Sequence, residues 1–129
     1  LGVDEDDELI ADARALRPGA TWLVQDLSEL DLPSVGVTEP FDVILCAGNV
    51  VTFAAPSTRI EVLRRMGLHL AARGRLVVGF GLDRDYPLAD FLADAAVAGL
   101  AVHSLHSTWE LHPSTDDDDF VVAILGRAA

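Results

Sequence analysis

The first candidate for chemistry is a carboxylate where an apolar segment ends and a helical pattern begins. Asp4 follows residues 1–3 and precedes a run of acids and a helix-like periodicity. In doubly wound sheets, an acid at the carboxyl end of the second strand accepts hydrogen bonds from ribose hydroxyls, because a carboxylate offers two charged acceptor oxygens. The alternative is that these acids only stabilise a helix N-terminus. We predict ribose binding for Asp4 and helix stabilisation for residues 6–8.

A second carboxylate, Asp26, follows the next strand-like segment, residues 21–24. Because the carboxyl ends of parallel strands meet at one edge of a sheet, Asp26 and Asp4 are expected at the same edge. A carboxylate at this place could accept a hydrogen bond from an exocyclic amine such as that of adenine. It could equally cap a turn. From the residues alone, both interpretations stay open.

A third candidate is the turn after the strand-like residues 41–46. Gly48 and Asn49 follow it, and small residues there let a ligand approach the backbone closely. The alternative is a plain turn in which Asn49 adopts a left-handed conformation. Cys46, the single cysteine, is expected to be inert apolar packing.

Strand-like and helix-like patterns alternate, which indicates an α/β fold with a mostly parallel, Rossmann-like sheet and helices on both faces. The expected strands are residues 1–4, 21–24, 41–46, 75–80, 101–109 and 120–125. The expected helices are residues 6–16, 56–74 (with a possible capping box of Thr58 and Glu61) and 87–99. In the first of them, Leu9, Ala13 and Leu16 are expected on the inner face. Only a loop separates the last two strands, so we predict that they pair antiparallel.

Composition limits the function classes. The chain has 129 residues, enough for one domain, and half of them are hydrophobic. Its formal net charge is −12 and it contains no lysine, which excludes P-loop, Schiff-base and kinase chemistry and disfavours nucleic acid as a partner. A lone cysteine excludes a disulfide framework and favours the cytoplasm. No apolar run is long enough for a membrane helix, and no metal site is expected.

Three segments together resemble a class I S-adenosylmethionine-dependent methyltransferase. "GVDEDDELIADAR" is similar to that family's second strand with its ribose acid, and "VQDLSEL" to its adenine-contacting segment. "FDVILCAGNVVTF" is similar to the fourth strand and the turn beneath the methionine part of the cofactor. "LHLAARGRLVVGF" resembles the helix and strand that follow. The final antiparallel strand pair also matches the family's pattern.

The resemblance implies S-adenosylmethionine as the cofactor, with Asp4 on the ribose and Asp26 on the adenine amine. Leu27 would supply a backbone contact, and Glu5 would lie beside the adenosine. Cys46 and Asn49 would border the methionine part. No catalytic residue is assigned.

The chain departs from the family in lacking the first strand and its glycine-rich turn. We therefore expect residues 1–129 to be a fragment of a methyltransferase-like domain, from the end of the second strand to the last strand. Without its central strand, the sheet would have unpaired edges. The fragment alone should then bind the cofactor poorly, or complete its sheet from a second copy as a homodimer.

The implied reaction is in-line attack by a small-molecule acceptor on the sulfonium methyl, with the protein supplying alignment and exclusion of water. Candidates for the acceptor side of the rim are Asn49, Phe53, Asp83, Tyr86, Trp109 and His112. Three alternatives remain. A receiver-like signalling domain would require an aspartate where Cys46 stands and a lysine, and a nicotinamide-dependent oxidoreductase would continue with parallel units. A catalytically inactive interaction module would keep the same fold.

Overall fold

The computed structural model describes all residues, 1–129, and its helices and strands alternate along the chain. The strands are β1 (Gly2–Asp4), β2 (Trp22–Val24), β3 (Phe41–Cys46), β4 (Leu70–Gly81), β5 (Leu100–His106) and β6 (Phe120–Arg127). The α-helices are α1 (Asp7–Leu16), α2 (Val50–Phe53), α3 (Arg59–Leu68) and α4 (Leu88–Val97). Short 3-10 helices lie at Leu27–Glu29, Pro33–Val35 and Pro56–Thr58. The predicted α/β class is confirmed.

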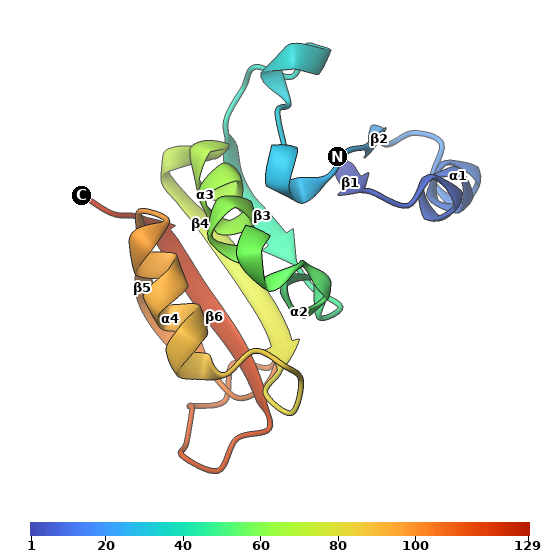
Figure 1. Cartoon of the computed structure of the whole chain (residues 1–129). Coiled ribbons are helices and arrows are strands. Elements are labelled where there is room, and N and C mark those ends of the chain that lie inside the picture. The colour runs from blue at the N-terminus through green and yellow to red at the C-terminus, as the bar shows by residue number, and fades with distance from the viewer.

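The strands form two sheets (Figure 1). β1 and β2 pair in parallel as a two-stranded sheet, and the other four strands follow the order β3-β4-β6-β5. β3 is parallel to β4, whereas β6 runs antiparallel to both of its neighbours. The predicted antiparallel pairing of the last two strands is therefore confirmed, and β6 is inserted between β4 and β5.

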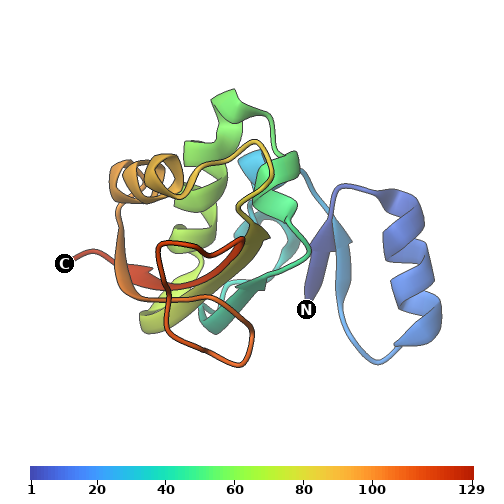
Figure 2. The ribbon, with the colours of Figure 1, turned by 90° about the horizontal axis from the view of Figure 1, so that it is seen from below.

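The main core lies between the four-stranded sheet and helices α3 and α4, which gather on one of its faces (Figure 2). Leu76, Val78 and Phe80 point to that face from β4 and are completely buried. Phe80 packs against Phe91 of α4 and Tyr86, with ring centroids 5.1 and 5.5 Å away. These alternate positions of β4 explain why its sequence is almost entirely apolar around them.

The opposite face of β3 is open. Val43 and Leu45 are 61% and 63% exposed there, although β-branched and apolar residues of a Rossmann-like strand are usually covered on both faces. Further along this face, the Trp109 ring lies against Gly79. The four-stranded sheet is thus covered by helices on one side only within residues 1–129, and not on both faces as the sequence predicted.

An apolar slot separates β1 from β3. Its volume is about 510 Å³, and 13 of its 16 lining residues are hydrophobic. β1 pairs only with β2, and β3 pairs only with β4, so each strand presents one free edge. The unpaired edges expected from the sequence are present, and they flank this slot.

Two local predictions about α3 are wrong. The helix ends at Leu68 and not near Gly74, because residues from Leu70 onward pair with β3 as the start of β4. Gly74 instead lies at an irregularity of this pairing, where an added Cβ would stand 2.7 Å from the Phe41 carbonyl oxygen. The Thr58–Glu61 capping box does not form, since the Thr58 hydroxyl donates to the Ala55 carbonyl.

The predicted inner face of α1 is also wrong. Leu9 and Leu16 are 55% and 72% exposed, and Ile10 is the buried residue of this helix. α1 packs mainly against the small β1–β2 sheet, which offers too little surface to cover a full apolar stripe.

Candidate functional site

Asp4 is the last residue of β1, and two residues separate it from the start of α1 at Asp7. One of its carboxylate oxygens accepts a hydrogen bond from the Asp6 amide at 2.9 Å. Asp6 in turn is the N-cap of α1 and accepts from the amides of Glu8 and Leu9 at 2.9 and 3.2 Å. Asp4 is therefore oriented by the cap, and its second oxygen has no protein partner.

Asp26 follows β2 and caps the 3-10 helix Leu27–Glu29. One carboxylate oxygen accepts from both the hydroxyl and the amide of Ser28, each at 2.8 Å. These two hydrogen bonds hold the pKa of Asp26 below its ordinary value, so the group is a charged acceptor at neutral pH. The turn-capping role considered for Asp26 is thus present, and the other oxygen stays free for a second role.

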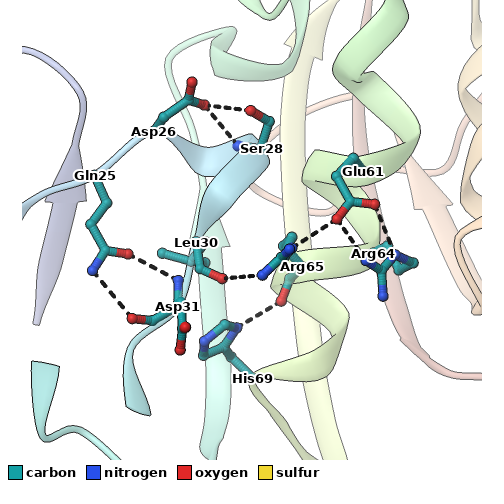
Figure 3. A network of polar contacts seen from close by, with 9 residues as sticks. All are labelled: Gln25, Asp26, Ser28, Leu30, Asp31, Glu61, Arg64, Arg65 and His69. Atoms are coloured by element: carbon teal, nitrogen blue, oxygen red, sulfur yellow. Dashed lines mark hydrogen bonds and ion pairs between the residues drawn. The ribbon is translucent and has the colours of Figure 1, made fainter. Parts of the chain in front are cut away.

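A polar network fastens the segment after β2 to α3 (Figure 3). The Gln25 side-chain amide pairs with the backbone of Asp31, at 3.0 and 3.3 Å. The Leu32 amide donates to His69 Nε2 at 3.1 Å, which leaves His69 Nδ1 to donate to the Arg65 carbonyl at 2.7 Å. This neutral tautomer is assigned by the network, and the arrangement fixes the loop that presents Asp26.

Sequence reasoning missed His69, because nothing in its local pattern distinguishes it from a surface histidine. Its two partners lie on different elements: Arg65 is one turn earlier on α3, and Leu32 is 37 residues away in the chain. Only the tertiary structure brings them together.

Asp4 and Asp26 line one cavity of about 590 Å³ at the carboxyl ends of β1, β2 and β3. Glu5 and Leu27 line it as well, so four of the six residues singled out in the sequence lie at one site. The opposite wall comes from the turn after β3, from α2 and from the start of α3, and it is mostly apolar: Gly48, Val50, Phe53, Ala54, Ala55, Thr58 and Val62.

Cys46 and Asn49 do not line this cavity. Cys46 is buried beside the slot between β1 and β3, and burial raises the pKa of its thiol to about 11, consistent with inert packing. Asn49 has φ 62°, and its side-chain oxygen accepts from the Gly81 amide at 2.7 Å. Its amide is therefore turned toward the end of β4, and its neighbours Gly48 and Val50 form the cavity wall in its place.

No family model matches the chain, and no curated protein matches its sequence. Solved structures do match. A TehB-like SAM-dependent methyltransferase from Corynebacterium glutamicum is 36% identical, with a TM-score of 0.90, over 98% of this chain and 66% of that one. A SAM-dependent methyltransferase from Clostridium acetobutylicum (10% identical, TM-score 0.86) and the CcbJ methyltransferase from Streptomyces caelestis (15%, 0.85) share the fold. The alignments cover 98% and 99% of this chain and 74% of each of theirs.

The chain has the fold of the class I S-adenosylmethionine-dependent methyltransferases. It spans 66% of the length of the Corynebacterium protein. The resemblance predicted from the sequence motifs is therefore confirmed for the fold.

The cavity of this chain is lined by charged groups of one sign only. Its lining contains four carboxylates, Asp4, Glu5, Asp6 and Asp26, and no arginine or histidine. A dinucleotide's phosphates would face these acids with no cation to balance them. S-adenosylmethionine carries no phosphate, while its sulfonium and ammonium groups are positive, so the donor set fits this cofactor.

Only some of the residues expected at the acceptor side lie near the cavity. Phe53 lines the cavity and is 70% exposed. Tyr86 is wrong as a rim residue: it is buried, and its hydroxyl donates to Asp94 at 2.6 Å. Burial, followed by this carboxylate, raises the pKa of Tyr86 and keeps its hydroxyl protonated. Trp109 contacts Gly79 on the open face of the sheet, away from the cavity-lining residues.

Arg59 is a second residue that sequence reasoning missed. It is the one charged residue of the chain that is buried, at 8% exposure. Its guanidinium donates to the carbonyls of Thr52 and Asp85 at 3.2 and 3.0 Å and stacks on the Tyr86 ring at 4.1 Å. Arg59 thereby holds α2 against the loop that follows β4.

Proposed function

We propose that this chain takes part in methyl transfer from S-adenosylmethionine to a small-molecule acceptor. The observation that carries the proposal is the position of Asp4 and Asp26, each with a free carboxylate oxygen, on the wall of one cavity that has no cation. The 36% identity to a SAM-dependent methyltransferase supports it independently. One neighbour of the same fold, the glycopeptide N-methyltransferase MtfA, was crystallised with S-adenosylmethionine.

The cofactor supplies a methyl group on a positive sulfur, which is already a strong leaving group. The chain's own residues would bind and orient it. The free oxygen of Asp4 would accept from the ribose hydroxyls, and that of Asp26 would accept from the adenine amine. Val50 and Ala54 would exclude water at the opposite wall. Catalysis of this kind rests on alignment, so no general base is assigned.

We propose a small molecule as acceptor in preference to nucleic acid. Phosphate-backbone binding needs a basic surface, whereas this chain has a net charge of −12. Among the structural neighbours, KedS8 is a sugar N-methyltransferase and MmcR a mitomycin 7-O-methyltransferase. No helix of the structure is both long and apolar enough to cross a membrane. The lone reduced cysteine supports a cytoplasmic location.

The proposal is tested by calorimetric titration of the chain with S-adenosylmethionine, with NAD⁺ as the phosphate-bearing control. We expect binding of S-adenosylmethionine and none of NAD⁺. Stronger binding of NAD⁺ would favour an oxidoreductase. If neither ligand binds to a folded chain in which the slot between β1 and β3 is covered, the result would favour the catalytically inactive interaction module.

We also propose that the free edges of β1 and β3 pair in a homodimer. The slot between them is lined by apolar residues, and the adjoining Val43 and Leu45 of β3 are exposed, so a second copy would cover unpaired backbone and apolar surface together. Light scattering should give twice the mass of one chain. Under conditions in which the monomer prevails, cofactor binding should be weak. A monomer that binds S-adenosylmethionine tightly would contradict this proposal.

A further inference from the structure

An exposed aromatic ring stands at the edge of the cavity with no packing role. Phe53 lines the cavity and yet is 70% exposed, whereas the three aromatic rings of the core, Phe80, Tyr86 and Phe91, are all buried. Leaving such a ring in water forgoes the free energy of burying it. A ring kept at a cavity mouth is therefore available to a ligand.

The face of this ring already holds a cation. The Arg84 guanidinium lies over Phe53, with its central carbon 5.4 Å from the ring centroid. Arg84 is exposed, and its side chain makes no hydrogen bond or ion pair within the protein. The Phe53 ring is therefore the group that this guanidinium packs on. A cation–π contact at an exposed site is weak, so another cation can replace it.

Oxygen acceptors converge on the same place. A carbon added to Gly81 would lie 2.7 Å from Asp83 Oδ1, 3.5 Å from Asn49 Oδ1 and 3.6 Å from Arg84 Nε. The Asp83 carboxylate and the Arg84 guanidinium thus both lie close to the Gly81 backbone, and we call this arrangement the cradle. Asp83 does not form an ion pair with Arg84, so its charge is available to a ligand.

Arg59 links the two backbone segments that carry Phe53 and Arg84. Buried Arg59 donates to the carbonyl of Thr52, next to Phe53, and to that of Asp85, next to Arg84. The cradle is therefore built on backbone that cannot drift apart without orphaning a buried guanidinium.

The surrounding surface is negative. The Leu82 amide donates to the Asp119 carbonyl at 2.7 Å, which ties the acidic loop 116–119 to the end of β4. Within that loop, hydrogen bonds from Thr115 and Ser114 keep the pKa of Asp118 below its ordinary value, so its charge persists. Such a field attracts cations and repels anions over roughly 8–10 Å at physiological salt.

We propose that Phe53 and Asp83 form a cation-binding subsite for a positively charged amine of the methyl acceptor, which would displace the chain's own Arg84 from the face of the Phe53 ring. The subsite stands on the geometry alone. Only its assignment to the acceptor rests on the proposed function. The acceptor class is accordingly a small molecule that bears an ammonium group.

The test is an NMR titration of the chain with choline, read at the Gly81 amide and the Phe53 ring. A neutral molecule of the same shape, 3,3-dimethyl-1-butanol, and acetate are the control ligands. We expect choline to shift both signals and the other two to leave them unchanged. Equal shifts with dimethylbutanol would show an apolar site, and binding of acetate would show Arg84 to be an anion receptor. Either result overturns the proposal.

Variants sharpen the test, and all of the altered side chains are exposed. Arg84→Gln should raise the affinity for choline at least threefold, because it empties the ring face. Phe53→Leu and Asp83→Asn should each lower it at least threefold. Arg73→Gln, an exposed arginine near the start of β4, is the matched control and should have no effect. Equal behaviour of Arg84→Gln and Arg73→Gln would overturn the proposal.

Titration of S-adenosylmethionine separates this inference from the proposed function. Choline should still bind when S-adenosylmethionine is saturating. Competition between the two would place the subsite in the cofactor half and overturn the acceptor assignment. Choline binding by a chain that binds no S-adenosylmethionine would leave the subsite standing and contradict the proposed function.

Discussion

The β1–α1–β2 unit and the four-stranded sheet differ in how much buried packing stabilises each of them. Of the first 29 residues, only Ile10 is buried, whereas most residues of β4 and β6 are buried. β1 and β2 share three paired residues, and α1 is ten residues long. Elements this short are marginal without tertiary packing.

The weaker region nevertheless carries the cofactor candidates Asp4, Glu5 and Asp26, while the stronger region supplies the opposite, mostly apolar wall. Binding elements are often drawn from the least stable part of a fold. A ligand that bridges both regions must also order the first one, so its affinity depends on whatever covers the slot between β1 and β3. In this chain, the apolar scaffold and the proposed polar contacts to the cofactor are therefore separated in sequence and in stability.

The largest effect should come from the core of the four-stranded sheet. Phe80→Ala removes a fully buried ring between Tyr86 and Phe91 and should cost about 3–5 kcal/mol in the free energy of unfolding. Phe53→Ala, the exposed control, should change it by less than about 0.5 kcal/mol. Urea unfolding followed by circular dichroism measures both. Similar losses in the two variants would contradict the division between core and rim.

The next effect concerns the weaker region's proposed role. Asp4→Ala should weaken S-adenosylmethionine binding by about 1.5–3 kcal/mol, the range for hydrogen bonds to a charged group. Asp7→Ala, in the first turn of α1 and outside the cavity lining, is the matched control and should leave affinity unchanged. Calorimetry compares the two. Unchanged affinity in Asp4→Ala would remove Asp4 from the site.

The same two regions show what the sequence could and could not predict. β3 was predicted with its observed bounds, because strand periodicity is a local property. The meeting of Asp4 and Asp26 was predictable as well, because the carboxyl ends of parallel strands share an edge. Burial depends on partners that are distant in the chain. Tyr86 was expected at the rim and lies in the core, while Leu9 and Leu16 were expected inside and lie exposed.

Other features had no sequence signal at all. Arg59 is buried because two carbonyls from separate loops and the Tyr86 ring surround it, and none of these is encoded next to it. The side chain of Asn49 was expected beside the cofactor, yet it binds the Gly81 amide 32 residues away. The direction of a side chain at a turn depends on which hydrogen-bonding groups the neighbouring strand presents to it.

A smaller effect should stay within the first region. Asp6→Ala removes the N-cap bonds to Glu8 and Leu9 and should destabilise α1 by about 1 kcal/mol. Hydrogen exchange should speed up in α1 amides and remain unchanged in β4 and β6. Asp12→Ala, an exposed position within α1, serves as the control and should not accelerate exchange. Faster exchange throughout the chain would show that the two regions unfold as one unit.

The smallest effect concerns a half-buried junction between the regions. Glu61 accepts hydrogen bonds from Arg64 and Arg65, and Arg65 also donates to the Leu30 carbonyl at 3.4 Å, on the segment that follows Asp26. The Arg64 hydrogen bond first, and then that of Arg65, lower the pKa of Glu61 from 4.5 to about 2.

Because this pKa is lower in the folded chain than in the unfolded one, the stabilisation is complete above pH 4.5 and is lost as the pH falls toward about 2. An NMR titration of the Glu61 carboxyl carbon should give the low midpoint, and Arg64→Gln should raise it. Arg73→Gln should leave it unchanged. A midpoint near 4.5 in the unaltered chain would mean that the arginines do not hold this carboxylate in solution, and that the loop bearing Asp26 is fastened to α3 by His69 instead.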